Sequence, residues 1–364
     1  MRLEPVRTRA ELDAFVELPL RLQPRHLSVP MDAGRLRRWW RGRSAHTGVV
    51  ELFVLRDDAG EVVARTTVHD DRRLDERLGA RNRLFGATEF ASPAAASALL
   101  AELERLARRR GDAQLFGPVS LLPNQAGGVI TSGFERRGFV DSAWNPDWYP
   151  TAYESAGFVR WGEADTWVVE ARGAPPPTAS ELADAGVRLE YGARRRMREL
   201  VPELRELLNA SFAALPYYTP ITAEEMAEAT AGLAHLLDER LLLLARDAAT
   251  GRLVSFVLVV PDITAFVQRV GGDLSLVNQL RLLATRRRYR RAAILVIQGT
   301  DPGRQGRGIL GLLSRQLQAN LADGGYERLR STYVGRDNPA SARQFSRFGG
   351  TPLHGYTFYR KALA

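Results

Sequence analysis

The segment Asp301–Leu313, which reads DPGRQGRGILGLL, combines residue types that can bind a phosphate group. Four glycines and three arginines or glutamines precede a leucine-rich run. A glycine costs roughly 0.5–1 kcal/mol in a regular element, so this many glycines at a predicted helix start suggest a function. The first helical turn has unpaired N–H groups at the positive end of the helix dipole, and glycines let an anion approach them. We therefore predict a phosphate-binding turn, with added charge from Arg304 and Arg307.

The neighbouring residues predict the elements that position this turn. The continuous apolar run Ala292–Pro302 is typical of a buried strand and leads directly into the loop. The apolar residues from Ile309 to Leu321 share one face of a predicted helix. A further strand at Tyr326–Val334 and a short helix at Asn338–Gly350 follow. The predicted order is therefore strand, glycine-rich turn, helix, strand, helix.

The first half of the chain repeats this order more faintly. A hairpin at Val49–Asp71 precedes a strand at Asn82–Phe90, a helix at Ser92–Gly111 and a strand at Ala113–Leu121. A helix, glycine and strand follow within Tyr153–Val169. We infer an internal duplication.

Three consecutive prolines divide the chain into two halves of similar length, because they suit neither a helix nor a central strand. We expect a first domain at 1–172, a proline-rich linker at 173–180 and a second domain at 181–364. The predicted fold class is α/β, with a central mixed sheet flanked by helices in each domain.

The stretch from Gln305 to Ile309 resembles the pyrophosphate loop of the GNAT (N-acetyltransferase) superfamily, Gln/Arg-x-x-Gly-x-Gly/Ala, although Leu310 stands where Gly or Ala is usual. Asn338, followed eleven residues later by Gly349, also fits that family. The resemblance implies two tandem GNAT-like domains and acetyl-CoA or another acyl-CoA as co-substrate. It implies that the strand at about Ile294–Gln298 splays from its neighbour and pairs with the pantetheine arm. The implied coenzyme A-binding residues are Ile297, Arg304, Gln305, Gly306, Arg307, Gly308, Ile309 and Asn338. The first half has no such loop before its helix, so we expect its domain to be degenerate.

The resemblance also implies an N-acyltransferase in which an amine attacks the thioester directly. Many members carry a tyrosine that protonates the leaving thiolate, but Phe345 occupies that position here. By position alone, Tyr333 and Tyr359 are substitutes, as is Tyr356. Asp337 is a candidate for the group that accepts the amine proton. Tyr217, Tyr218 and Glu224 are candidates for binding the amine acceptor, and Glu224 is also a candidate base.

A basic segment at Leu274–Ala292 ends in RRRYRR. Its arginines could bind the 3′-phosphate of coenzyme A, an acyl carrier protein or RNA. Two alternative functions therefore stay open. One is an aminoacyl-tRNA-dependent transferase, which the intact coenzyme A loop disfavours. The other is an acyl-CoA-binding protein that lacks catalysis.

The composition of the chain limits which partners, metal sites and cellular locations we expect. The chain has 364 residues, no cysteine and a formal net charge of +9, which is compatible with anionic partners. Its five histidines are scattered, so we expect no metal site. We found no signal-peptide pattern and no long uncharged apolar run, and expect a cytoplasmic protein with no membrane partner. The expected partner is a small-molecule or peptide amine, and tRNA is not favoured. The oligomeric state stays open.

Overall fold

The computed structural model describes residues 1–46, 48–231 and 236–363. The strands are β1 (Arg2–Pro5), β2 (Glu51–Arg56), β3 (Val62–His69), β4 (Asn82–Phe90), β5 (Gln114–Gly117), β6 (Val129–Ser132), β7 (Val159–Glu170), β8 (Val187–Tyr191), β9 (Leu242–Asp247), β10 (Leu253–Pro261), β11 (Ala292–Thr300), β12 (Arg328–Gly335) and β13 (Thr351–Ala362). The helices are α1 (Arg9–Leu22), α2 (Ala33–Trp40), α3 (Arg72–Leu78), α4 (Pro93–Arg110), α5 (Tyr149–Ser155), α6 (Ala179–Asp184), α7 (Met197–Phe212), α8 (Ala223–Thr230), α10 (Thr264–Arg269), α11 (Leu276–Thr285), α12 (Ile309–Asp323) and α13 (Pro339–Arg347). Short 3-10 turns are η1 (Arg194–Arg196), η2 (Glu239–Leu241), η3 (Arg286–Tyr289) and η4 (Pro302–Arg304).

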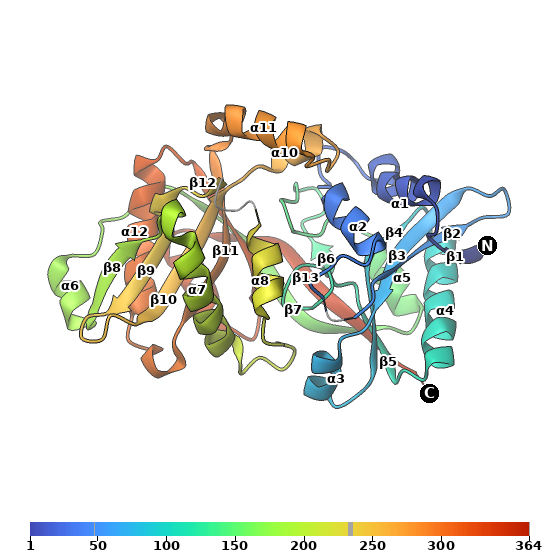
Figure 1. Cartoon of the computed structure of the whole chain (residues 1–364), viewed down its shortest axis with the longest axis horizontal. Helices are drawn as coiled ribbons and strands as arrows, with labels where there is room; N and C mark the ends of the chain where they lie inside the picture. Colours follow the sequence, from blue (N-terminus) through green and yellow to red (C-terminus); the bar gives the residue numbers. More distant parts are fainter. Residues whose placement is uncertain (47, 232–235, 364) are drawn as a thin grey trace.

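One mixed sheet runs through both halves of the molecule (Figure 1). The strand order is β1-β2-β3-β4-β5-β13-β7-β12-β11-β10-β9-β8, and β6 pairs with β13 beside this path. In each half, one parallel pair, β4 with β5 or β11 with β12, lies among antiparallel neighbours. The predicted α/β class with a mixed sheet flanked by helices is confirmed.

The two halves exchange their last strands. β13, from the end of the second half, pairs with β5 of the first half. β7, from the end of the first half, pairs with β12 of the second. β13 and β7 also pair with each other in antiparallel register over most of their lengths. The halves are therefore joined by continuous backbone hydrogen bonding at the middle of the sheet, which the division at the prolines did not anticipate.

The inferred repeat is visible in the element order. β2-β3-β4-α4-β5-α5-β7 in the first half matches β9-β10-β11-α12-β12-α13-β13 in the second. Each repeat has its own apolar core, one between the sheet and α4 and the other between the sheet and α12. In the second half, η1 leads directly into α7, which contains Pro202. Within the described residues, no helix is both long enough and apolar enough to cross a bilayer.

Candidate functional site

The strand before the glycine-rich loop separates from its parallel neighbour halfway along. β11 pairs with β12 only from Ala292 to Leu295, whereas β11 continues to Thr300. A bulge in its pairing with β10 skips Val296, whose side chain is 37% exposed. The hydroxyl of Thr332 on β12 donates to the Val296 carbonyl at 2.9 Å. The splay expected around residues 294–298 is thus present, and backbone beyond Leu295 on the β12 side is left without a strand partner.

The loop after β11 has the conformation that its glycines permit. Gly306 and Gly308 adopt φ of +78° and +75°, where residues with a side chain are disfavoured. A Cβ atom at either position would meet nothing within 4 Å, so the space above them is open. Gly308 is the N-cap of α12 and supplies no side-chain cap. The first-turn N–H groups of α12, including that of Ile309, therefore lie beside open space at the positive end of the helix dipole.

The polar side chains of the loop differ in how available they are to bind an added anion. Arg304 forms an ion pair with Asp247, the last residue of β9. The side-chain amide of Gln305 lies 3.3 Å from the Thr300 carbonyl, and the residue is exposed. Arg307 is exposed and forms no ion pair with any described residue. Arg307 is therefore the loop cation that is ready for an added anion, while Arg304 would have to leave Asp247.

In the first half, the start of α4 corresponds to the glycine loop before α12, and side chains close this position. Ser92 caps α4 by accepting a hydrogen bond from the Ala95 N–H, and Pro93 fills the first turn. Glu89, at the end of β4, is enclosed by Gln23 and Tyr149, which donate to its carboxylate at 2.7 and 3.3 Å. Burial raises the pKa of Glu89. The start of α4 thus carries a side-chain cap and a proline where α12 has Gly308 and no side-chain cap, and a first half without a coenzyme A site stays a prediction.

A small pocket begins where β12 ends, just beyond the splay. Of the residues predicted for the site, it brings together Tyr217, Tyr333, Asp337 and Tyr356. The other lining residues are Pro123, Gly127, Gly128, Gly162, Glu163, Ala164, Gly335, Thr357 and Phe358. Burial, followed by the nearby Asp337 charge, raises the pKa of Tyr217. Burial also raises the pKa of Tyr333 to about 12.

Both halves line this pocket, and none of the first-half lining residues was predicted from the sequence. Gly127 and Gly128 lie between β5 and β6, and Gly162–Ala164 lie on β7. The paired glycines and the isolated Gly162 were the available signals, because a glycine in a strand pattern often marks close backbone approach. No sequence pattern indicated which strands would face them.

The other predicted site residues lie elsewhere. Tyr218 is buried in the core beneath α7, where its hydroxyl donates to Asn209 at 2.7 Å. Glu224 is exposed on α8 and does not line the pocket. Tyr359 is buried in the first-half core, with its hydroxyl 3.0 Å from Glu154. Ile297 packs partly buried against the α7 core, so any contact with a ligand would be through its backbone.

Asn338, which fits the family pattern, and Phe345, which departs from it, both have structural roles at α13. The Asn338 side chain accepts from the Ser341 N–H at 3.2 Å and caps α13. Phe345, at the position of the usual tyrosine, is buried and stacks on Trp167 with ring centroids 5.9 Å apart. The core of the second half therefore uses Phe345 for packing.

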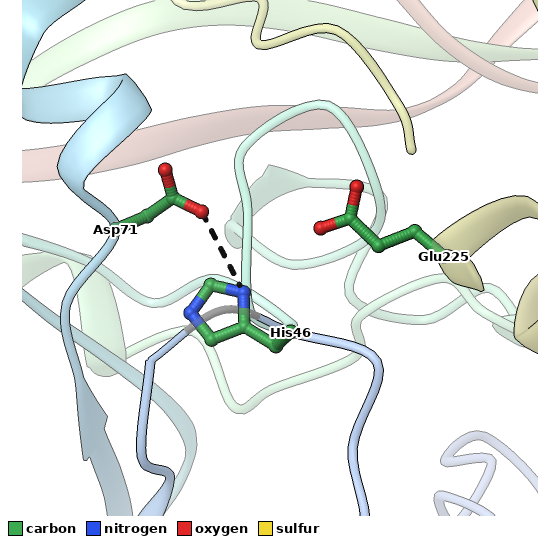
Figure 2. Close-up of side chains that lie close together, drawn as sticks. All are labelled: His46, Asp71 and Glu225. Atoms are coloured by element: carbon green, nitrogen blue, oxygen red, sulfur yellow. Dashed lines mark ion pairs between the residues drawn. The ribbon is translucent and has the colours of Figure 1, made fainter. Parts of the chain in front are cut away.

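A buried cluster holds the second half's α8 against the first half. Figure 2 shows the side chains of His46, Asp71 and Glu225 directed toward one another. Their potential ligand atoms lie within 4.8 Å, a spacing that would suit a metal ion. However, the guanidinium of Arg73 lies between the carboxylates, 2.7 Å from Asp71 and 2.6 Å from Glu225. The chain thus supplies its own cation here, and we assign no metal.

Arginines of α3 also fix the segment that carries Tyr217. Arg73 donates to the Pro220 carbonyl at 3.2 Å. Arg77 donates to the carbonyls of Ala213 and Leu215 at 2.6 and 2.8 Å. The segment from α7 to α8, which forms one wall of the pocket, is therefore positioned by the first half.

Comparison with curated proteins finds two relatives of low identity. The chain is 23% identical over 316 residues to Protein YghO of Escherichia coli, covering 84% of this chain and 80% of that protein. It is 23% identical over 378 residues to the bacterial ceramide synthase of Caulobacter vibrioides, covering 99% of this chain and 97% of that protein. No protein-family model matches the sequence.

Solved structures match over the full length. A GCN5-related N-acetyltransferase from Sphaerobacter thermophilus has a TM-score of 0.57 at 15% identity, covering 99% of this chain and 96% of that chain. A tandem GNAT protein from the clavulanic acid biosynthesis pathway has a TM-score of 0.59 at 15% identity, covering 100% of this chain and 98% of that chain. At these identities, the likeness concerns the fold. The expected resemblance is confirmed: the chain has the tandem fold of the GCN5-related N-acetyltransferases.

Proposed function

We propose that this chain is an acyl-CoA-dependent N-acyltransferase whose second half binds the donor. One observation carries the proposal. The open glycine loop at Gly306 and Gly308 and the splay after Leu295 belong to the same strand–loop–helix unit, next to a pocket lined by Tyr217, Tyr333 and Asp337. A pyrophosphate at the α12 N-terminus would place the pantetheine arm along the part of β11 that does not pair with β12, and would direct the thioester toward that pocket.

The reaction that we propose needs no covalent enzyme intermediate. The amine nitrogen attacks the thioester carbonyl carbon, the C–S bond breaks, and an amide forms. The amine loses a proton, which Asp337 accepts directly or through a water, and the thiolate gains one. Tyr333 is the proposed proton donor, because its phenol lines the same pocket and a pKa of about 12 keeps it protonated at neutral pH.

The acceptor class is proposed from the chemistry of a relative's product. A ceramide is a long-chain amino alcohol acylated on nitrogen, and the chain is similar over 99% of its length to a bacterial ceramide synthase. We propose a long-chain amine as the acceptor, joined to an acyl group through an amide bond. Tyr217 and Phe358, both of which line the pocket, offer apolar ring surface to such a molecule.

Release of coenzyme A thiol tests the proposal. Acetyl-CoA and a longer acyl-CoA would each be incubated with a long-chain amino alcohol, a short alkylamine and a lysine peptide. We expect amine-dependent thiol release, with amide product identified by mass spectrometry. Donor binding without turnover on any amine would favour a non-catalytic acyl-CoA-binding protein. Absence of donor binding, together with a gel shift of aminoacyl-tRNA, would favour the tRNA-dependent alternative.

A further inference from the structure

The basic segment forms a platform fixed across the two halves. α10, α11 and η3 pack on a small apolar cluster around Phe266, Leu282 and Tyr289, to which Val29 and Val140 of the first half contribute. Gln268 donates to the Ser28 carbonyl at 2.8 Å. Figure 1 shows α10 and α11 together along one outer edge of the molecule. The position of α11 is thus defined by contacts with both halves.

The face of α11 that points away from this cluster is apolar. Asn278 and Leu282, four residues apart, are buried on the inner face. Leu276 and Leu280 have the same spacing but are offset by two residues, which places them nearly opposite. Leu276, Val277 and Leu280 are 70%, 59% and 58% exposed. They are three of the eight exposed large hydrophobic side chains in the described parts of the chain, and such grouping marks an interaction surface.

Unpaired positive charge adjoins this apolar face. Arg281, Arg286, Arg287 and Arg288 are exposed, and none forms an ion pair with a described residue. Their neighbours Arg290 and Arg291 do have acidic partners, Asp238 and Glu327. Acidic side chains thus pair with the last two arginines of the run, whereas the preceding arginines are left without acidic partners among the described residues.

We propose that α11 and η3 dock on an anionic lipid bilayer surface. Leu276, Val277 and Leu280 would enter the boundary between head groups and acyl chains, and the four arginines would contact lipid phosphates. The helix would lie parallel to the surface, because its opposite side is occupied by the protein. This proposal departs from our expectation of no membrane partner. That expectation was made from the sequence, which does not show that these side chains are exposed. It does not depend on the proposed enzymatic function.

The combination of features distinguishes a bilayer from other partners. Arginines alone would suit RNA, but an RNA backbone offers nothing for a row of exposed leucine and valine side chains. A second copy of this chain would cover the apolar face, but would bring two sets of uncompensated arginines together. An anionic bilayer satisfies both the apolar and the charged part.

Co-sedimentation with vesicles tests the proposal on the full-length protein. Vesicles of phosphatidylcholine alone would be compared with vesicles containing one quarter phosphatidylglycerol. We expect binding to the anionic vesicles that weakens with added salt. L276S/L280S and R286Q/R287Q/R288Q should each weaken that binding by about tenfold or more. Both variants change exposed residues, so thermal unfolding should match that of the wild type.

Matched controls distinguish a specific effect of the α11 face from the general effects of removing an exposed apolar side chain or lowering the net charge. V49S removes an exposed valine elsewhere, and R105Q/R109Q/R172Q lowers the net charge by the same three units at other exposed positions. Both controls should bind as the wild type does. Failure to bind anionic vesicles would overturn the proposal, as would equal binding by the α11 variants. A dimer lost in L276S/L280S without vesicle binding would instead assign the face to self-association and would also overturn it.

Discussion

The hydroxyl of Tyr333 donates a hydrogen bond to the carbonyl of Gly127 at 2.5 Å and thereby connects the two halves at the pocket. Gly127 belongs to the loop between β5 and β6, whereas Tyr333 belongs to β12. If Tyr333 protonates the leaving thiolate, the phenol must exchange this carbonyl for the sulfur. The first half would then contribute directly to the site, by orienting the proposed acid.

Replacing Tyr333 with phenylalanine should lower kcat by about 100-fold, the lower end of the range for general acid–base catalysis. The dissociation constant for acyl-CoA should be unchanged, because the coenzyme loop is untouched. Steady-state kinetics and calorimetry together check both points. Y326F is the matched control, because the Tyr326 hydroxyl donates to Asp238 at 3.1 Å but lies outside the pocket. An unchanged kcat in Y333F would show that Tyr333 only supports the Gly127 loop.

Replacing Asp337 with asparagine should lower kcat/KM for the amine by about tenfold or more, because the proposed proton acceptor is lost. Its charge also raises the pKa of Tyr217, after the larger effect of burial, so D337N should lower the pKa of that phenol. Ultraviolet pH titration against Y217F measures this second effect. D323N, at an exposed residue paired with Arg240, serves as the control. Equal kcat/KM in D337N and D323N would remove Asp337 from the mechanism.

Replacing Arg73 with methionine should destabilise the fold by about 3 kcal/mol, because two buried carboxylates would lose their shared cation. Urea unfolding at neutral pH measures the change. R72M is the control on the same helix: Arg72 pairs with Glu76 and both are exposed, so about 0.5 kcal/mol or less is expected. If R73M were no less stable than R72M, the cluster would not be what holds α8 in place.

Acid should destabilise the first half through His69. Burial lowers the pKa of this imidazole from 6.5 to about 3, and it contacts the Leu121 carbonyl at 2.7 Å. Between these values the unfolded chain binds a proton that the native chain does not, so the free energy of unfolding falls as pH falls. The slope from this group approaches about 1.4 kcal/mol per pH unit. H69Q, whose amide can also donate, should show a smaller loss between pH 6 and 4; equal slopes would contradict the assignment.

Local elements were predicted well because their signals lie in short windows. The strand at Asn82–Phe90 was predicted with the bounds of β4, and the helix predicted at Ser92–Gly111 is α4, which Ser92 caps. The glycine loop could be predicted because backbone with positive φ favours glycine, and glycine supplies no side-chain cap. α1, α2 and α3 were not predicted, although Thr8, Asp32 and Asp71 all cap them.

Long-range relationships could not be predicted in the same way. The exchange of β7 and β13 depends on pairing between segments almost two hundred residues apart, and one sequence carries no register information at that range. Candidate tyrosines on one strand face different surroundings: Tyr356 lines the pocket, whereas Tyr359 enters the first-half core. The role of Arg73 could not be predicted, because it depends on the Glu225 carboxylate of α8, which is distant in the sequence.

Calorimetric titration with acetyl-CoA tests the central claim most directly, using G308V and the control G325V. Both glycines have positive φ, +75° and +74°, and a Cβ at either would meet nothing within 4 Å, but they lie at opposite ends of α12. We predict one binding site per chain, about tenfold or more weaker in G308V and unchanged in G325V. No binding by the wild type at millimolar acetyl-CoA, or equal affinity in the two variants, would contradict the assignment of this loop to the acyl donor.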